Sequence, residues 1–463
     1  MSVRGDHAIV IGGSVSGSPT AKVLSEFFDR VTVLDRDELP AHAEHHRGVP
    51  QSPHLHGLLY GGRLTLDELF DDGFTDSMRA AGGPYFDFAK HQAFRFPEGW
   101  IKRAPGDLMV IFSTRWTMEH VIRELARREP NIGWEVGQAS GFTTTEGGNR
   151  VTGVKLKDGR TIEADLVVDA AGRASKSPKW MEEIGFDAPQ ESYVRSFLGY
   201  ATVYGRLPED AWPGDIKSIA APPFPGTTRG AFVVPQENGL VGIMAAGQSR
   251  DYPPTDEAGF TEFLRTAISP LLAEMWEQME PETEIRSTKT SHNRLVRWHE
   301  LERRPQGFLA IGDAVAAFNP VYGQGITTAS LQAKALRQAL NDHDDLDAVV
   351  DVFPARAREV CAFAWTGATD ADCAFEGTEV ENLERTEADA EITAYLSKLR
   401  LATTLDSYVA QAFFRAQGSM QGELLFEPEL MARVEQVCAD WDEEPRDLSR
   451  PPEWADAEAP VAA

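Results

Sequence analysis

The chain has 463 residues, of which 42% are hydrophobic and 25% are charged, as in an ordinary globular protein with room for two or three lobes. Its formal net charge is −27, from 45 Lys and Arg against 72 Asp and Glu. A field of this sign repels nucleic acids and anionic lipid, because binding to both depends on neutralising phosphate, so we expect neither as a partner.

The sequence contains no uninterrupted apolar run of the roughly 18 residues that a transmembrane helix needs, so we expect no membrane span. The first strand begins close to Met1, which leaves no room for a signal peptide. Three widely spaced cysteines, Cys361, Cys373 and Cys438, form neither a disulfide framework nor a CxxC pair. We therefore expect a cytoplasmic protein.

The N-terminal segment predicts a βαβ unit. Residues 8–12 (AIVIG) and 31–35 (VTVLD) are short, apolar and β-branched, which is typical of buried parallel strands. Residues 20–28 between them follow a helical pattern. Proline is comfortable only in the first turn of a helix, so Pro19 predicts a local kink.

The middle of the chain changes from helical to strand-like patterns. Helices are expected over 63–70 and 114–129, where apolar residues recur with helical spacing. Residues 150–172 predict a hairpin turned at Asp158-Gly159 and then a buried strand. From Tyr193 to about Ala246 the pattern predicts a second lobe with its own sheet.

Residues 12–17 (GGSVSG) form an incomplete dinucleotide-binding turn. In the pattern G-x-G-x-x-G, Gly12 and Gly17 hold the outer positions and Ser14 replaces the middle glycine. Ser14 is small enough to let the backbone approach a phosphate, which the N-terminus of the following helix would face. Asp35, about 20 residues further on, can accept hydrogen bonds from a ribose. On its own, the turn is also compatible with a structural role without a ligand.

A second glycine turn lies some 300 residues later. Residues 308–314 predict a buried strand ending in Gly312-Asp313, and after a proline-bearing loop Gly323 and Gly325 open a helix over 325–340. Asp313 can bind a polyol hydroxyl, and backbone N–H groups after Gly323 can stabilise negative charge on a ring oxygen. A ligand with adenosine diphosphate at one end and a ribityl-linked ring at the other needs both turns. The two turns together therefore predict FAD.

These motifs resemble those of the class A, or single-component, flavoprotein monooxygenases, which share the fold of hydroxybenzoate hydroxylase and squalene epoxidase. The resemblance rests on GGSVSG with Asp35, on DLVVDAAGRAS (165–175) and on Gly312-Asp313, and it covers roughly residues 5–340. Within this group, RGVPQSPHLHGLL (47–59) and GDAVAAFNPVYGQGIT (312–327) are similar to epoxidases that act on polyene precursors of polyether antibiotics.

The resemblance implies a set of FAD contacts that draws on the whole N-terminal part of the chain and on the return segment. These residues are Gly12, Gly13, Ser14 and Gly17 at the pyrophosphate, Asp35, Arg36 and Ala139 at the adenosine, Arg47, Gln51 and Arg115 along the flavin chain, and Asp313, Pro320, Gly323, Gln324, Gly325 and Ile326 near the ring. The middle motif departs from the family, because Ala171-Gly172 stands in place of Asp-Gly. Asp169 or Arg173 could substitute there.

The fold class implied is α/β, with a Rossmann-type FAD-binding domain, a β-sheet substrate domain and a helical C-terminal region. We predict the FAD-binding domain over 1–190 and 301–345, the substrate lobe over 191–300, the helical region over 346–445 and a disordered acidic tail over 446–463.

Five of the eleven histidines lie within fifteen residues, namely His42, His45, His46, His54 and His56. Imidazole binds zinc, iron and copper, but no cysteine lies near and the Glu-plus-His spacing of a helical metal site is absent, so we expect no metal. His54 and His56 fall in the epoxidase-like segment. They are the candidate catalytic residues, expected close to the flavin.

The family resemblance implies that NADPH or NADH docks transiently and reduces FAD, that O₂ then forms a C4a-hydroperoxyflavin, and that this transfers one oxygen atom. No Tyr, His or Glu is spaced as the base that phenol hydroxylation needs. The expected reaction is therefore epoxidation of an alkene in a large hydrophobic polyketide or terpenoid, in antibiotic biosynthesis. An aromatic hydroxylase, a flavin-dependent reductase or dehydrogenase and a flavoprotein without turnover remain alternatives. The absence of W-x-W-x-I-P argues against a halogenase.

Overall fold

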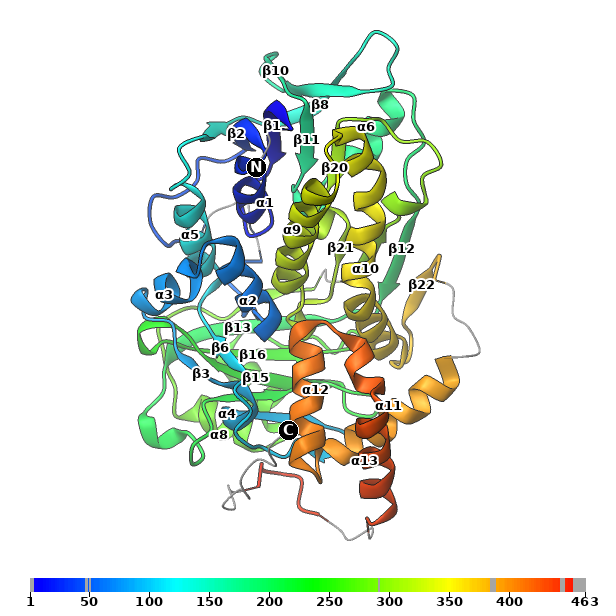
Figure 1. The fold of residues 1–463 in the computed structure, drawn as a ribbon. Helices are drawn as coiled ribbons and strands as arrows, with labels where there is room; N and C mark the ends of the chain where they lie inside the picture. The colour runs from blue at the N-terminus through cyan, green and yellow to red at the C-terminus, as the bar shows by residue number, and fades with distance from the viewer. Residues whose placement is uncertain are drawn as a thin grey trace.

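The computed structural model describes residues 4–45, 49, 51–289, 292–383, 389–441 and 446–452. A parallel sheet with its helices forms one half of the molecule, and a broad second sheet with the C-terminal helices forms the other (Figure 1). This mixed α/β architecture with a helical C-terminal region confirms the predicted fold class.

The parallel sheet has the strand order β20-β11-β1-β2-β7. Its strands are β1 (Gly5–Ile11), β2 (Phe28–Asp35), β7 (Ile132–Val136), β11 (Leu166–Asp169) and β20 (Phe308–Ala310). The strands predicted over 8–12 and 31–35 are β1 and β2. Ala8, Ile9 and Val10 are completely buried, as the apolar run of a central parallel strand requires.

Helix α1 (Gly17–Ser25) connects β1 to β2 and completes the predicted βαβ unit. The kink expected at Pro19 does not occur, because the helix begins earlier than predicted and Pro19 lies in its first turn. The N–H groups of a first turn have no intrahelical acceptor, so proline costs no hydrogen bond there. Helix α9 (Gly325–Asp342) packs beside α1 (Figure 1).

Smaller elements surround this core. The helices are α2 (Tyr60–Leu69), α3 (Gly73–Ala80), α4 (Phe88–His91), α5 (Arg115–Ala126), α6 (Ser177–Glu183) and α10 (Leu346–Cys373). A three-stranded sheet contains β8 (Ala139–Thr144), β9 (Val151–Leu156) and β10 (Thr161–Glu163), and a two-stranded sheet contains β3 (Tyr85–Asp87) and β6 (Met109–Ile111). The predicted hairpin at Asp158-Gly159 joins β9 to β10.

The second lobe is built on an eight-stranded sheet with the path β17-β13-β16-β15-β14-β4-β5, with β18 beside β13. The strands are β4 (Gln92–Phe96), β5 (Gly99–Trp100), β13 (Gly199–Arg206), β14 (Ser218–Ala221), β15 (Arg229–Pro235), β16 (Val241–Gly247), β17 (Glu280–Pro281) and β18 (Arg286–Thr288). β4 pairs in parallel with β14, so this sheet includes residues that the sequence places in the first segment of the FAD-binding domain.

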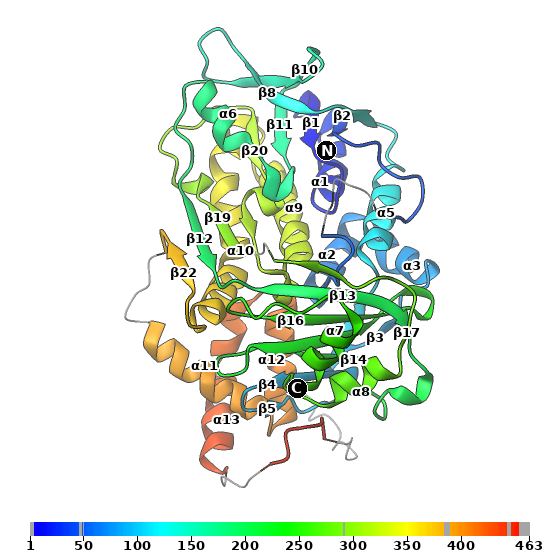
Figure 2. The same ribbon diagram turned by 180° about the vertical axis from the view of Figure 1, so that it is seen from behind.

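Helices cover the second sheet from outside. α7 (Glu257–Arg265) and α8 (Leu271–Glu277) lie across one face, where apolar residues of β13, β15 and β16 pack beneath them (Figure 2). A separate four-stranded sheet contains β12 (Glu191–Arg195), β19 (Asn293–Val296), β21 (Ala316–Ala317) and β22 (Glu379–Glu381).

The C-terminal helices are α11 (Asp389–Thr403), α12 (Ser407–Ser419) and α13 (Pro428–Ala439). Their apolar side chains pack together with those of α4 and β4. The tail was expected to be disordered from 446 onward, but residues 446–452 contact the second lobe. Trp100 Nε1 donates to the Leu448 carbonyl at 3.0 Å, and the Ser269 hydroxyl donates to the Ser449 carbonyl at 2.6 Å. The rest of the tail lies outside the described residues.

Among the helices that the structure describes, none combines the length and the hydropathy needed to cross a membrane.

The tightest packing in the βαβ unit is at Gly17. A Cβ atom placed on Gly17 would lie 1.8 Å from the carbonyl oxygen of Gly12, far inside any allowed contact, and both groups belong to backbone that cannot move independently. We therefore expect Gly17→Ala to lower the free energy of unfolding by about 3 kcal/mol or more. Gly367 in α10 has no atom within 4 Å of such a Cβ, so Gly367→Ala is the matched control and should stabilise slightly. Equal urea midpoints for the two variants would contradict this packing.

Candidate cofactor site

Three segments far apart in the sequence meet at the carboxyl edge of the parallel sheet. A Cβ on Gly12, whose φ is +101°, would lie 2.7 Å from the Ala170 carbonyl oxygen, and a Cβ on Gly312, with φ +68°, would lie 2.7 Å from the Cβ of Ser16. The N-terminal turn, the middle motif and the return segment are therefore in contact. The carboxyl edge of an open α/β sheet is where such folds bind ligands.

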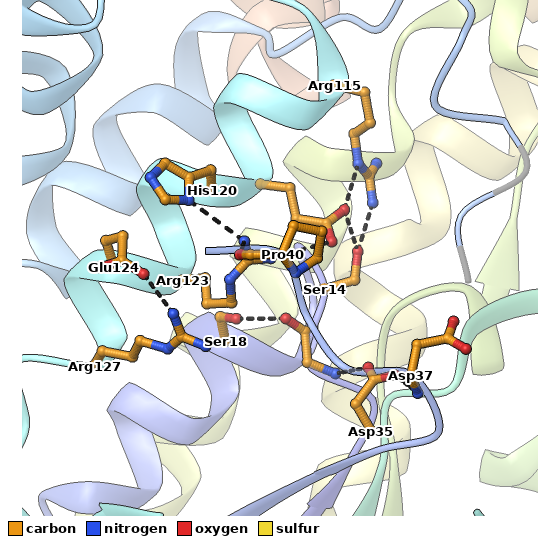
Figure 3. Close-up of polar contacts among 12 residues, drawn as sticks. Ser14, Ser18, Asp35, Asp37, Pro40, Arg115, His120, Arg123, Glu124 and Arg127 are labelled. Carbon is orange, nitrogen blue, oxygen red and sulfur yellow. Dashed lines mark hydrogen bonds and ion pairs between the residues drawn. The ribbon is translucent and has the colours of Figure 1, made fainter. Parts of the chain in front are cut away.

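The N-terminal turn is organised by Ser14 and Asp35 (Figure 3). The Ser14 hydroxyl accepts a hydrogen bond from Arg115 at 2.8 Å and donates one to Glu119 at 2.9 Å. The Asp35 carboxylate accepts from the backbone N–H of Gly13 at 2.8 Å, and its other oxygen accepts from Asp37 at 3.0 Å. Ser14, Asp35 and Arg115 were all predicted from the sequence, and the structure brings them to the same turn.

Glu119 is a buried carboxylate that the sequence does not single out. It lies 3.2 Å from Arg115 Nε and 3.8 Å from Arg123 Nη1, on the same face of α5. The spacing of four residues on either side of Glu119 is the only pattern that could have indicated it. Its effect is to hold the Arg115 guanidinium beside the N-terminus of α1, where that cation favours a bound anion.

Residues of the second lobe fix the start of α5. Glu237 accepts from the backbone N–H of Thr114 at 2.8 Å and from the Thr117 hydroxyl at 2.6 Å. The first of these bonds satisfies a backbone N–H that a helix N-terminus leaves unpaired. The position of Arg115, the first residue of α5, therefore depends on a carboxylate from the opposite lobe.

The return segment places a second helix N-terminus at the site. The side chain of Gln324, the N-cap of α9, is buried, and its Oε1 has no hydrogen-bond partner within the described chain. Gly323 has φ +63°, and a Cβ on Gly57 would lie 3.1 Å from the Cα of Gly323. The segment that carries His54 and His56 is therefore packed against the α9 turn. Asp313 lies near this turn and is 3.5 Å from Arg173 Nε.

His54 connects this segment to the sheet of the second lobe. Its side chain is 4% exposed, its Nδ1 lies 3.0 Å from Thr202 Oγ1, and its ring meets that of Tyr200 edge-on at 4.6 Å. Burial and, to a smaller extent, Arg286 lower the pKa of His54 to about 4. His54 is therefore neutral at neutral pH.

His56 lies on the cofactor side of the same segment. Its Nδ1 is 2.9 Å from the His54 carbonyl oxygen. Burial and the nearby Arg115 guanidinium lower its pKa to about 3. Both histidines are therefore uncharged near neutral pH.

The middle motif is arranged around Asp169, which is buried. It accepts from the backbone N–H of Ala171 at 2.9 Å and from the Ser175 hydroxyl, and burial raises its pKa. Arg173 donates to the carbonyl oxygens of His292 and Phe318. Both candidates for the missing Asp of the motif therefore have protein partners.

The remaining predicted contacts differ in exposure. Arg36 is exposed beside Asp37, and Gln51 is exposed. Ala139 begins β8, two residues after Gly137, whose N–H donates to the Asp35 carbonyl oxygen at 2.7 Å. Among the other predicted contacts near the ring, Pro320 begins the turn before Gly323, and Ile326 is buried in the first turn of α9. Arg47 lies outside the described residues.

The edge as a whole fits FAD. Neither α1 nor α9 has a side-chain cap or an acidic residue in its first turn, so both N-termini keep the partial positive charge that binds anions. Arg115, paired with Glu119, adds a guanidinium at the first N-terminus, and the Gln324 oxygen without a partner lies at the second. The N–H donors suit a diphosphate at one end and an electron-rich ring at the other, where the Gln324 oxygen can accept from a ring N–H.

No group of three or more His, Cys, Asp and Glu that could hold a metal occurs in the part of the chain that the structure describes. His46 lies outside that part.

Beside this site, ten positions on the inner strands of one face of the large sheet carry no charge, and they are called the uncharged face below. Cross-strand pairing aligns Thr202, Met244, Phe232, Ala220 and Phe94 in one row and Tyr204, Gly242, Val234, Ser218 and Gln92 in the next. None of these ten described positions carries a charge. Leu55, Trp116 and Val321 pack on this face, so it is the face toward the cofactor edge. Arg286 on the edge strand β18 pairs with Thr202, so an exposed cation ends the first row.

Comparison with family models finds none that matches this chain. Among curated proteins, Protein Rv3254 of Mycobacterium tuberculosis is 32% identical over 355 residues, which cover 72% of this chain and 73% of the relative. The kynurenine 3-monooxygenase of Salinispora tropica is 25% identical over 370 residues, covering 74% and 75% of the two chains.

Solved structures share the fold at lower identity. A triple mutant of the flavin-dependent brominase Bmp2 has a TM-score of 0.65 at 13% identity and covers 95% of this chain and 100% of its own. Pseudomonas aeruginosa PqsL in complex with 2-aminobenzoylacetate has a TM-score of 0.61 at 15% identity and covers 80% and 98%. A variant of 2-methyl-3-hydroxypyridine-5-carboxylic acid oxygenase has a TM-score of 0.59 at 18% identity and covers 79% and 90%. The chain therefore has the fold of the flavin-dependent monooxygenases and belongs to the family of Protein Rv3254 of Mycobacterium tuberculosis.

Proposed function

We propose that the protein is a FAD-dependent monooxygenase that uses NADPH or NADH and O₂ to epoxidise an alkene of a large hydrophobic polyketide or terpenoid. The observation that carries this proposal is the uncharged face of the large sheet beside a site that fits FAD. An apolar substrate lying on that face would remove water from no charged side chain there, so little hydration energy would be lost. It would also shield the site from water.

The FAD would be held by the contacts predicted from the sequence. Ser14, Arg115 and the N-terminus of α1 would bind the diphosphate, Asp35 the ribose, and the turn from Gly323 to Ile326 the ring. Bound FAD, reduced by NADPH or NADH, would pass the reducing equivalents to O₂ and activate it for transfer of one oxygen atom. The chain itself would orient the substrate and keep water out, and it would place no charged side chain beside the carbons that accept the oxygen.

The titratable groups on the uncharged face favour epoxidation over phenol hydroxylation. A phenol must lose a proton to become nucleophilic, and a base with the pKa of His54 would have to remove a proton from a group with a pKa of about 10, at a cost of roughly 8 kcal/mol. Burial raises the pKa of Tyr200 and of Tyr204, so both stay protonated. An alkene attacks an electrophilic oxygen without losing a proton and needs no such base.

The named relatives support the coarser part of this proposal. A kynurenine monooxygenase, a flavin-dependent brominase and a pyridine-carboxylic acid oxygenase all fall among the similar proteins. Hydroxylation of an aromatic ring and flavin-dependent reduction without oxygen transfer are the competing outcomes that the experiments below separate.

Ser14 tests the position of the diphosphate. We expect Ser14→Gly to keep FAD bound and Ser14→Leu to lose at least 90% of it, because a branched side chain would hold the backbone away from the phosphates. FAD retained after gel filtration, measured by its absorbance, gives the occupancy. Normal occupancy in Ser14→Leu would mean that this turn is not the diphosphate site.

Isotopically labelled O₂ tests the reaction. Polyenes and phenols are screened for stimulation of NADPH oxidation, and we expect a polyene to stimulate it and to gain one labelled oxygen in an epoxide, or in an ether or diol derived from it, by mass spectrometry. Label confined to a phenolic hydroxyl would make the enzyme an aromatic hydroxylase. Stimulated NADPH oxidation with no labelled product and no O₂ uptake would make it a reductase. Added bromide should have no effect on the product.

The neutral state of His54 predicts acid sensitivity. Its pKa is about 4 in the folded protein and about 6.5 when unfolded, so between these values the unfolded chain binds more protons and stability falls as pH falls. At pH 4 this loss amounts to roughly 3 kcal/mol. We expect His54→Gln to reduce the difference in unfolding free energy between pH 7 and pH 4 by about that amount, while His42→Gln on the exposed loop leaves it unchanged. An identical pH dependence in all three proteins would show that His54 is accessible to protons.

A further inference from the structure

Asp372, near the C-terminal end of α10, is a completely buried carboxylate that the predicted site does not include. Its Oδ1 accepts from the Tyr322 hydroxyl at 2.7 Å, and its Oδ2 accepts from Asn293 Nδ2 at 2.6 Å and from Asn319 Nδ2. Among the described residues, all its side-chain hydrogen-bond partners are neutral. A buried carboxylate with neutral donors costs more to bury than an amide of the same shape, which suggests that its acceptor capacity is used.

Donors to Asp372 lie at both ends of one short turn. Asn319 immediately precedes the turn at Pro320–Tyr322, and Tyr322 is its last residue. Asn293 Oδ1 also accepts from the backbone N–H of Asn319 at 2.8 Å, so the start of the turn is held twice. Gly323 and the N-terminus of α9 follow directly. The carboxylate therefore fixes the part of the chain that is proposed to hold the flavin ring.

The same carboxylate reaches the second lobe. Gln248 Nε2 donates to Asp372 Oδ1 at 3.3 Å, and Gln248 directly follows β16, one of the central strands of the uncharged face. The Ser196 hydroxyl accepts from Asn319 Nδ2 at 3.2 Å and opposes the rise in the pKa of Asp372, and Ser196 lies just before β13. The Asp372 side chain thus ties the ring turn to the end of β16, a strand of the uncharged face.

An amide cannot replace this carboxylate without loss. Every partner presents a donor, and a carboxylate has about four acceptor sites and no hydrogen to clash with them. Asn at this position would direct an N–H₂ group at one set of donors and would leave at least one of them unpaired in a buried site. Burial raises the pKa of Asp372, and the hydrogen bonds from Tyr322, Ser196, Gln248 and Asn319 oppose that rise.

We propose that Asp372 is a positioning residue that sets the Pro320–Gly323 turn against the uncharged face and so fixes the ring of FAD relative to the substrate. This inference rests on the proposed function, because it takes the turn to be the ring site. The role differs from ordinary core stabilisation in one measurable respect. It acts on the environment of the bound ring as well as on the stability of the apoprotein.

The test compares Asp372→Asn and Tyr322→Phe with Glu359→Gln, an exposed carboxylate on the same helix. FAD alone is the probe. Its dissociation constant is measured by flavin fluorescence, and its ring environment by visible absorption and visible circular dichroism of the holoprotein. Urea unfolding of each apoprotein measures stability separately.

We expect Asp372→Asn to bind FAD about tenfold more weakly and to change the visible circular dichroism of the flavin. Tyr322→Phe should change both in the same direction by a smaller factor, and Glu359→Gln should change neither. If Asp372→Asn does not fold, Tyr322→Phe decides the question by the same two readouts.

Two outcomes overturn the inference in different ways. Asp372 would be a structural core residue only if Asp372→Asn and Tyr322→Phe both had lower urea midpoints but kept the wild-type FAD affinity and the wild-type flavin dichroism. Failure of the unmodified protein to bind FAD would overturn the proposed function and the positioning role with it.

Discussion

The site depends on the close approach of the return segment to the N-terminal turn. Gly312 and Ser16 are separated by nearly 300 residues, yet there is no room between them for one added carbon atom. There is likewise no room for an added carbon atom between Gly12 and the Ala170 carbonyl. This contact forces two helix N-termini to open onto one edge of the parallel sheet. Each N-terminus alone is a weak anion site, and together they place two such sites at one edge of the sheet.

At this edge of the sheet, the buried carboxylate of Glu119 fixes the position of the Arg115 cation. Glu119 holds Arg115 and accepts from Ser14, so the guanidinium is directed before any ligand arrives. A freely rotating arginine would lose rotamer entropy on binding an anion, and prior fixation reduces that cost. The carboxylate also partly neutralises the cation. The structure therefore favours a precise, moderate attraction for a diphosphate over a strong, unspecific one, in a protein whose overall charge is strongly negative.

The residues that sequence predicts best are those set by local geometry. Gly12, Gly17, Gly312 and Gly323 follow from the turn spacing, because positive φ angles and missing side chains leave a pattern in the sequence itself. The βαβ unit and the helix at 325–340 follow from hydrophobic periodicity for the same reason. The positions of the predicted cofactor residues around FAD stay predictions, and the domain boundaries likewise.

Features that depend on distant partners could not be predicted. β4 joins the second sheet by pairing in parallel with β14, more than 100 residues later, and nothing local to residues 92–96 specifies that partner. Glu237 and Asp372 are ordinary acidic residues in the sequence, and they matter only because folding brings donors from another segment to them. Pro19 was misjudged for a related reason, since its effect depends on where α1 begins rather than on the proline itself.

Buried carboxylates couple the two lobes in both directions. Glu237 reaches from the second lobe to the start of α5 and so to Arg115, while Asp372 reaches from α10 to the ring turn and to the end of β16. If the lobes separated by about 1 Å, each of these hydrogen bonds would break. The donors and acceptors are buried, so no water would take the place of the lost partner. His54, bonded to Thr202, adds a third link without a charge. An uncharged sheet face makes few directional contacts of its own. These links at its margins give the lobes one relative position, as the proposed oxygen transfer to one double bond requires.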